Sequence, residues 1–290
     1  MTDPTPRFPL YVVSYGRYQN CRTANELDLY DVPFYIVVEP EQYDQYARNY
    51  DEDRLLSVPD RFHEEYDTFD EGIEGKSRGP GPARNFAWEH SIENGYDRHW
   101  VIDDNIQRFY RYHENEIIPF GDASGFRCME DFVLQYENIA MAGPRYESFV
   151  IRRSKKPPLT FNTRIYSCNL IQNDVDYRWR GRYNEDTDLS LRLLKAGHCT
   201  VLFNVVLQNK IATQRVEGGN TENFYEAEGT YPKSKMLKDM HPGVTTLTKK
   251  WGRWHHEVNY RPFKGNELIK RDDAEAVETG DYDIALVPGS

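Results

Sequence analysis

The sequence predicts an α/β fold in which a mostly parallel sheet is flanked by helices. Apolar runs alternate with helical patterns over residues 9–105, which is typical of βαβ units with right-handed crossovers. The run Phe34–Val38 is apolar throughout, as expected of a parallel strand buried on both faces. Polar residues stand at the ends of three of the expected strands, at Ser14, Glu39 and Asp103. Since ligands bind outside the carboxyl ends of such strands, these positions indicate one shared crevice.

The first half of the chain is expected to alternate strands and helices. Each strand is a short apolar run that ends at a polar or turn-forming residue, and the expected strands are residues 9–14, 34–38, 55–58 and 100–102. The helices between them are expected at residues 20–29, 41–50 and 83–94. Gly95 ends the last helix. The segment 70–82 is rich in glycine and charge and predicts a loop.

The second half is expected to hold a helix at 131–141, a strand pair in 161–172, a helix at 184–196 and a strand at 198–206. The helix at 184–196 has the clearest pattern, because its leucines recur on one face and Gly197 follows its end. The polar, glycine-bearing segment 214–231 predicts a mobile loop.

We expect three regions along the chain. Residues 1–210 form a nucleotide-binding and catalytic core, residues 211–271 form the loop and a basic, aromatic C-terminal extension, and residues 272–290 form a tail. A chain of 290 residues buries roughly three quarters of its unfolded surface, so it needs no structural metal to fold. Its four cysteines lie far apart without a CxxC pair, which argues against a zinc site or a disulfide framework.

Charge is distributed unevenly. The net charge is −11, yet residues 141–182 carry +6 and residues 231–271 carry +7, which leaves −24 for the rest. Overall acidity argues against non-specific nucleic-acid binding, whereas the two basic segments are either a polyanion-binding face or ordinary solvated surface. The chain has no apolar run of membrane-spanning length and no signal-peptide pattern at its start. We therefore expect a cytoplasmic protein with reduced thiols and no membrane partner.

Two acidic groups are candidates for chemistry. Asp103 and Asp104 follow an apolar strand, where paired carboxylates hold a divalent cation that bridges diphosphate oxygens, or form a plain turn. Glu185 and Asp186 begin a predicted helix, where carboxylates either complement the helix dipole or act as a general base. A glycine–proline loop also places Arg84 in the first turns of a helix, a suitable site for phosphate.

The order of these parts resembles the GT-A glycosyltransferases, specifically inverting enzymes that use nucleotide-diphosphate sugars. The resemblance covers roughly residues 9–210, through the blocks Ser14-Tyr15-Gly16-Arg17, Glu39, Ala83-Arg84-Asn85, Asp103-Asp104-Asn105 and Glu185–Leu193. More narrowly, the chain is similar to the phage TET-associated glycosyltransferases that modify 5-hydroxymethylpyrimidines in DNA. The features behind this likeness are Gly79–Asn85, Gly218-Gly219-Asn220, His241-Pro242 and Trp251–Tyr260.

The resemblance implies a Rossmann-like sheet, a uridine-diphosphate sugar (UDP-sugar) as donor, and hexosyltransferase activity that depends on Mn²⁺ or Mg²⁺. It implies that the nucleotide-sugar lies against Ser14, Tyr15, Gly16, Arg17, Glu39, Arg84 and Asp103. It further implies that Asp104 binds the metal, that Asp186 is the base and that Glu185 supports the acceptor or the sugar.

Two departures from the family pattern concern the metal. Asn105 stands where a third acid is expected, which leaves Asp103 and Asp104 as alternative ligands. The resembling enzymes often supply a metal-binding histidine after the base-bearing helix. Because no histidine occurs between His198 and His241, His241 is the candidate.

The implied acceptor is the hydroxyl of 5-hydroxymethylcytosine in DNA, in the host cytoplasm if the gene belongs to a phage. Such a base must leave the duplex stack to be modified. The candidates for phosphate contact are Arg152, Arg153, Lys155, Lys156, Arg178, Arg180, Arg182, Lys249, Lys250 and Arg253. The candidates for stacking are Trp179, Trp251 and Trp254. Two alternatives stay open: the same fold acting on a glycan, protein or small molecule, and a non-catalytic nucleotide- or DNA-binding module.

Overall fold

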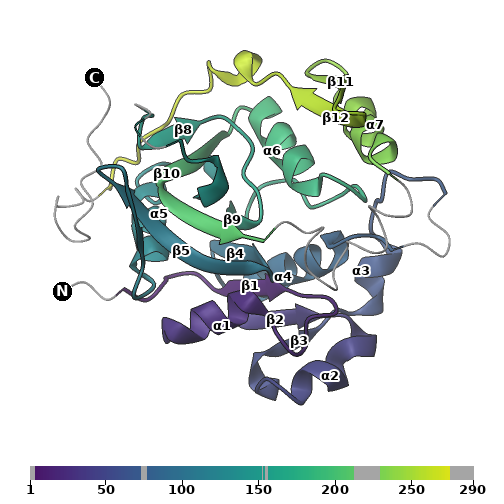
Figure 1. Ribbon diagram of the computed structural model, residues 1–290, viewed down its shortest axis with the longest axis vertical. Helices are drawn as coiled ribbons and strands as arrows, with labels where there is room; N and C mark the ends of the chain where they lie inside the picture. The colour runs from purple at the N-terminus through teal and green to yellow at the C-terminus, as the bar shows by residue number, and fades with distance from the viewer. Residues whose placement is uncertain (1–3, 73–76, 152, 154–155, 212–228, 275–290) are drawn as a thin grey trace.

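The computed structural model describes residues 4–72, 77–151, 153, 156–211 and 229–274. Within these residues a ten-stranded sheet forms the centre of the molecule, and a separate two-stranded hairpin lies at one end (Figure 1). The predicted α/β class, with a large and mostly parallel central sheet flanked by helices, is confirmed. Among the described helices, none combines the length and the apolar character that crossing a bilayer requires.

The first half of the chain forms a parallel block. Its strands lie in the order β3, β2, β1, β4, with bounds Leu55–Ser57, Tyr35–Val38, Leu10–Val13 and Arg98–Asp103. The helices of this half are α1 to α4, with bounds Arg22–Leu29, Tyr43–Ala47, Asp60–Glu64 and Gly81–Glu93. Because parallel strands end at the same edge, the polar residues after β1, β2 and β4 lie at one edge of the sheet.

The second half continues the sheet with mixed directions. The strands β9, β7, β10, β5 and β6 follow β4 across the sheet, and β8 pairs with β10. Their bounds are Cys168–Gln172, Ile139–Tyr146, Cys199–Lys210, Ile106–His113, Glu116–Pro119 and, for β8, Leu159–Phe161. The helices of this half are α5 at Ser124–Val133 and α6 at Glu185–Lys195. β10 runs parallel to β7 and antiparallel to β5.

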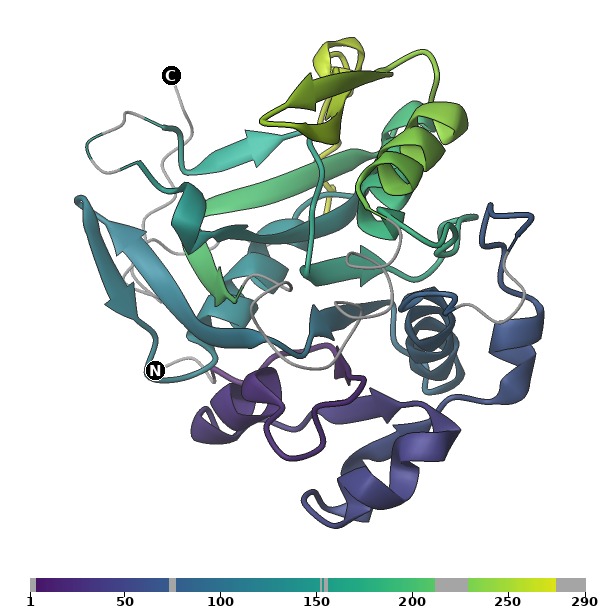
Figure 2. The ribbon, with the colours of Figure 1, turned by 45° about the vertical axis from the view of Figure 1, so that its right-hand side comes forward.

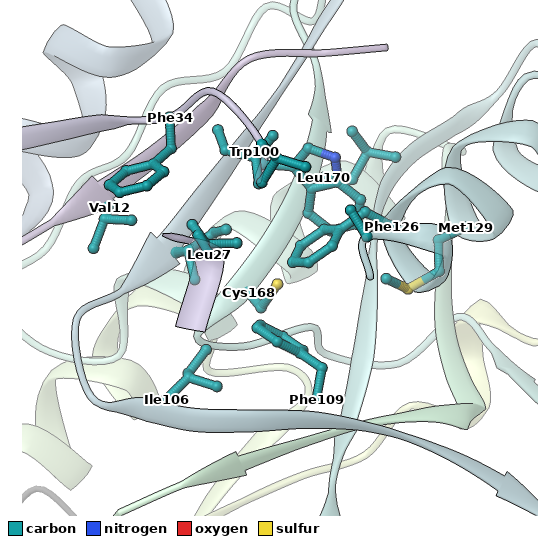
Figure 3. Close-up of a cluster of buried hydrophobic side chains, with 14 of the residues drawn as sticks. Val12, Leu27, Phe34, Trp100, Ile106, Phe109, Phe126, Met129, Cys168 and Leu170 are labelled. Carbon is teal, nitrogen blue, oxygen red and sulfur yellow. The ribbon is translucent and has the colours of Figure 1, made fainter. Parts of the chain in front are cut away.

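Alternation along the strands buries side chains on both faces of the sheet. Val12 of β1 belongs to the largest apolar cluster, with Leu27 of α1 and Phe126 of α5 (Figure 3). Its neighbour Tyr11 packs on the opposite face, in a cluster with Ala87 of α4. The helices α4 and α6 thus cover the same sheet from the second face, and their N-termini approach the strand ends.

The C-terminal extension packs on α6. It consists of α7 (Tyr231–Met240) and the hairpin β11 (Thr245–Lys250) and β12 (Arg253–Val258), which lie beside α6 in both views (Figures 1 and 2). Leu191 and Leu194 of α6 share an apolar cluster with Leu237 of α7 and Phe263. The extension is therefore anchored to the helix that carries the second acidic group.

Several predicted elements differ from the structure. The helix expected at 131–141 is wrong, because α5 ends at Val133 and the buried run from Ile139 is strand β7. A short buried apolar run fits either a helix or a strand by periodicity alone. The strand expected to end at Val206 continues to Lys210. The predicted loop at 214–231 lies outside the described residues as far as residue 228, as does most of the predicted tail.

Candidate active site

A cavity of about 410 Å³ lies at the strand ends. Its wall includes nine of the residues that the sequence assigns to the nucleotide-sugar, the metal or catalysis: Ser14, Tyr15, Arg17, Glu39, Arg84, Asp103, Asp104, Glu185 and Asp186. Two of the assigned residues, Gly16 and His241, are not part of this wall. The two acidic groups, which are far apart in sequence, therefore face one cavity.

Asp104 is bound by the loop that follows β1. One oxygen, Oδ1, forms an ion pair with Arg17. The other, Oδ2, accepts hydrogen bonds from Oγ of Ser14 at 2.8 Å and from the backbone N–H of Tyr15 at 3.3 Å. Burial raises the pKa of Asp104, and the Arg17 guanidinium opposes that shift.

Asp103 is bound by two other cations. Its Oδ1 accepts a hydrogen bond from Nη2 of Arg84 at 2.7 Å, and its Oδ2 accepts one from Nζ of Lys210 at 2.5 Å. Lys210 also donates to Oγ of Ser167 at 2.9 Å. Although burial alone would raise it, Lys210 and Arg84 hold the pKa of Asp103 well below its usual range. Asp103 is therefore a carboxylate.

Thr23, near the start of α1, fixes the corner at which the two aspartates diverge. Its Oγ1 donates to the carbonyl of Asp103 at 2.5 Å and accepts from the N–H of Ile106 at 3.0 Å. The N–H of Thr23 donates to the carbonyl of Asp104 at 3.3 Å. The neighbouring carboxylates thus lie at a fixed corner and bond to different groups.

The glycine–proline loop before α4 requires its glycines. Gly79 has a φ of +80°, and a Cβ there would lie 2.8 Å from the carbonyl oxygen of Arg182. A Cβ on Gly81 would overlap the ring of Tyr66. Close approach of these backbones is possible only without side chains, and it places Arg84 in the first turn of α4.

Arg84 connects the two acidic groups. It is buried, and its guanidinium carbon lies 4.6 Å from the ring centroid of Trp179. Besides its bond to Asp103, its Nη1 lies 3.2 Å from Oε1 of Glu185. Burial raises the pKa of Glu185 to about 7, and the charge of Arg84 opposes this shift. Arg84 therefore stabilises carboxylates from β4 and from α6 at once.

The carboxylates at the start of α6 have separate roles. Asp186 lines the cavity, and its Oδ1 accepts a hydrogen bond from the N–H of Thr187 at 2.6 Å. Asp188 is fully buried and forms ion pairs with Arg180 at 3.2 Å and with Arg192 at 2.7 Å. Asp188 is thus bound to neighbouring side chains of the scaffold, whereas Asp186, which also accepts a first-turn N–H of α6, reaches the cavity together with Glu185.

The structure does not bring His241 to the aspartate pair. Its Nε2 lies 2.8 Å from Oδ1 of Asp188, and its Nδ1 lies 2.8 Å from Nζ of Lys195. The ring is buried, with both nitrogens engaged. His241 thus connects α6 to the extension and does not fit the role of a metal ligand.

The predicted nucleotide loops are held by contacts at the cavity rim. Glu39 lines the cavity, and its Oε2 lies 2.7 Å from Nε2 of His63. Hydrogen bonding to Glu39 raises the pKa of His63. Gly16 contributes backbone only: its N–H donates to Oε1 of Gln42 at 2.7 Å.

The aspartate pair does not fit a divalent cation. Each of its four carboxylate oxygens already accepts a contact from Arg17, Ser14, Arg84 or Lys210. Mn²⁺ and Mg²⁺ need several oxygen ligands at one point. Among the residues that the structure describes, no group of three or more His, Cys, Asp or Glu side chains is placed to hold a metal. We therefore derive no step through a metal.

The candidates for DNA contact fall into two groups. Exposed ones are Arg153, Lys156, Arg178, Lys249, Lys250 and Arg253, whereas Arg152 and Lys155 lie outside the described residues. Arg180 pairs with Asp188, and the side chain of Arg182 is only 1% exposed and pairs with Asp70. These two arginines belong to the scaffold of the site because their charges are bound inward, which corrects their assignment to a DNA-facing surface.

The three tryptophans that are candidates for stacking also divide into a buried one and two exposed ones. Trp179 is buried in an apolar cluster against α4 and α6. Trp251, at the tip of the β11–β12 hairpin, is 91% exposed, and Trp254 is 36% exposed. Of these three tryptophans, only the two of the hairpin are exposed.

Sequence reasoning missed several residues of the cavity wall, among them His63, Tyr146, Ser167 and Lys210. Lys210 was missed because the strand that carries it was expected to stop four residues earlier. The signal that could have found it is the continued strand pattern, which ends at a lysine shortly before the glycine-bearing segment.

An open α/β sheet with polar strand ends, a buried arginine at a helix start and two acidic groups on one cavity suits a transferase that binds a nucleotide-linked donor. A sequence model of the family described as TET-Associated Glycosyltransferase matches residues 8–219. The chain belongs to this family and is a glycosyltransferase. A comparison with curated proteins found no match.

Proposed function

We propose that the protein transfers a sugar from a UDP-sugar to the hydroxyl of 5-hydroxymethylcytosine in DNA. The observation that supports this proposal is the shared cavity, in which Asp186 of α6 faces the strand-end residues Asp103 and Asp104. A binding module does not require a carboxylate opposite its ligand groups, whereas a transferase needs a base near the donor.

The donor is expected to lie along the parallel strand ends. The uracil and ribose lie against the loop from Ser14 to Arg17 and against Glu39, whose side chains line the cavity. Asp104 holds this loop through Ser14 and Tyr15. Binding of the nucleotide therefore uses a rigid wall, which lowers the conformational entropy lost on association.

The reaction is a single displacement. The acceptor hydroxyl oxygen attacks the anomeric carbon, the bond from that carbon to the diphosphate oxygen breaks, and its electron pair leaves with UDP. The hydroxyl proton passes to Asp186. Attack from the face opposite the leaving group inverts the anomeric configuration. Glu185, held at Arg84, orients the sugar or the acceptor.

The acceptor is expected to approach from the side of the C-terminal extension. The extension packs on α6, and its hairpin presents Lys249, Lys250 and Arg253 together with Trp251. Cationic side chains bind phosphates without regard to sequence, and an aromatic ring stacks on an unpaired base. This arrangement favours DNA over a sugar or small-molecule acceptor.

The proposal is tested by intact-mass analysis of acceptors after incubation with a panel of UDP-sugars. The acceptors are a duplex with 5-hydroxymethylcytosine, the same duplex with cytosine, an oligosaccharide mixture, and water alone. We expect one added sugar per hydroxymethylated base and none on the cytosine duplex. Sugar addition to oligosaccharides without addition to hydroxymethylated DNA would replace the proposed acceptor with a glycan.

A further inference from the structure

The aspartate pair is surrounded by fixed cations. Lys210, the last residue of β10, donates to Asp103 and Ser167 and lines the cavity with 16% of its side chain exposed. An ammonium group carries three protons, so its contacts with described residues leave one for a ligand. Arg84 approaches Asp103 from the opposite side.

The charge on Lys210 is maintained despite its burial. Its ammonium group forms an ion pair with the carboxylate of Asp103, and Asp186 lines the same cavity. Lys210 therefore lies within electrostatic reach of both the strand-end aspartate and the proposed base. Asp103, Asp186 and Lys210 all line the cavity that the proposed function assigns to the donor.

Asn105 ties Lys210 to the aspartate corner. Its side-chain Nδ2 donates to the carbonyl of Ile211 at 3.0 Å, and the N–H of Ile211 donates to the carbonyl of Asn105 at 3.2 Å. A carboxylate at position 105 could not donate the first of these bonds. The residue that departs from the acidic pattern thus fixes the end of β10 beside Asp103.

We propose that Lys210, together with Arg84, neutralises the leaving diphosphate in place of a divalent cation, so that this transferase works without metal. The inference rests on the proposed function. As the bond to the anomeric carbon breaks, negative charge grows on the diphosphate oxygens. A preorganised ammonium group in a site shielded from water stabilises that charge without reorganisation.

A divalent cation would have to compete with these side chains for the carboxylates of Asp103 and Asp104. To reach the oxygens of Asp103 or Asp104 it would have to displace Lys210 or Arg17 from a buried ion pair. Displacing either cation would leave its own charge without a partner in a largely enclosed site. Side chains that already supply the charge make the metal unnecessary.

The test compares transfer and UDP binding in excess EDTA with the same measurements in Mn²⁺ or Mg²⁺. We expect turnover and the Kd for UDP from calorimetry to change less than about twofold between these conditions. Lys210→Met should lower kcat by about 10²–10³-fold, the effect of removing one preorganised charge-stabilising donor, and Mn²⁺ should not restore it. Lys210→Arg should keep more activity than Lys210→Met.

Arg48→Met serves as the control, because Arg48 is exposed, lies at the end of α2 and not in the C-terminal extension, and is outside the cavity wall. It should leave both measurements unchanged. Thermal unfolding of each variant shows whether the fold is intact, and if Lys210→Met fails to fold, the EDTA comparison on the unmodified protein decides. Wild-type transfer that stops in EDTA and returns with metal overturns the inference and leaves the proposed function standing. If no acceptor is glycosylated under any condition, the proposed function fails, and metal-dependent UDP binding would then overturn the inference independently.

Discussion

Asp103 and Glu185 are bridged by one buried guanidinium. Arg84 donates to Oδ1 of Asp103 at 2.7 Å, while its Nη1 lies 3.2 Å from Oε1 of Glu185. A strand end and a helix start are thereby joined into one electrostatic unit. A change in the charge of one carboxylate therefore changes the electrostatic interaction of Arg84 with the other.

Glu185 should link stability to pH. Its ordinary pKa is 4.5, and burial raises the pKa to about 7 in the folded protein. Between these values the folded state binds more protons than the unfolded chain, so the free energy of unfolding falls as pH rises from 4.5 to about 7. Glu185 contributes at most ~3 kcal/mol to this change in the free energy of unfolding.

Urea unfolding at about pH 5 and about pH 8 measures the contribution of Glu185 to the free energy of unfolding. Glu185→Gln should show a smaller loss of stability over that interval than the wild type. A residual slope should remain, because burial also raises the pKa of Glu130 to about 7. Equal slopes in the variant and the wild type would show that Glu185 is not desolvated as described.

His241 should act on stability and not through a metal. His241→Ala removes the contacts with Asp188 and Lys195 and should destabilise the protein by about 1–3 kcal/mol, the cost of leaving a buried polar group unpaired. Thermal melts of both proteins with EDTA and with Mn²⁺ provide the measurement. A Mn²⁺-dependent rise of the melting temperature that only the wild type shows would restore His241 as a ligand.

The hairpin should account for part of the salt dependence of DNA binding. Replacing Lys249, Lys250 and Arg253 by Gln should weaken binding and lower the slope of log K against log salt by roughly 2–3, because each phosphate contact contributes about 0.9. Donor hydrolysis in water should be unchanged. Fluorescence anisotropy across a salt series gives the slope.

Arg22→Gln with Arg48→Gln is the matched control, since these arginines lie on α1 and at the end of α2, at the opposite end of the molecule from the hairpin (Figure 1). This pair should leave the slope unchanged. An unaltered slope in the hairpin variant would place the DNA elsewhere.

The sequence predicts the parallel half of the fold well. Apolar runs such as Phe34–Val38 are unambiguous because turn signals and helical patterns flank them. The strand-end groups were found for the same reason: Asp103 and Asp104 stand directly after such a run, and both line the cavity.

The rest depends on tertiary contacts that local pattern does not encode. Ile139–Tyr146 forms a strand because β9 and β10 pair with it, although its first three residues also suit a helix. The partners of Asp103 could not be found from spacing, because Lys210 reaches it from a distant strand. Likewise, Arg180 and Arg182 are part of a basic segment in sequence, yet ion pairs bind them inward.

The most direct test of the account is transfer to hydroxymethylated DNA by Asp186→Asn, measured by intact mass under single-turnover conditions. Loss of the Asp186 carboxylate should slow transfer by about 10²–10⁴-fold, while calorimetry should show UDP binding close to that of the wild type. Such a result would support Asp186 as the proton acceptor in the shared cavity. Transfer by the variant at the wild-type rate would contradict the account.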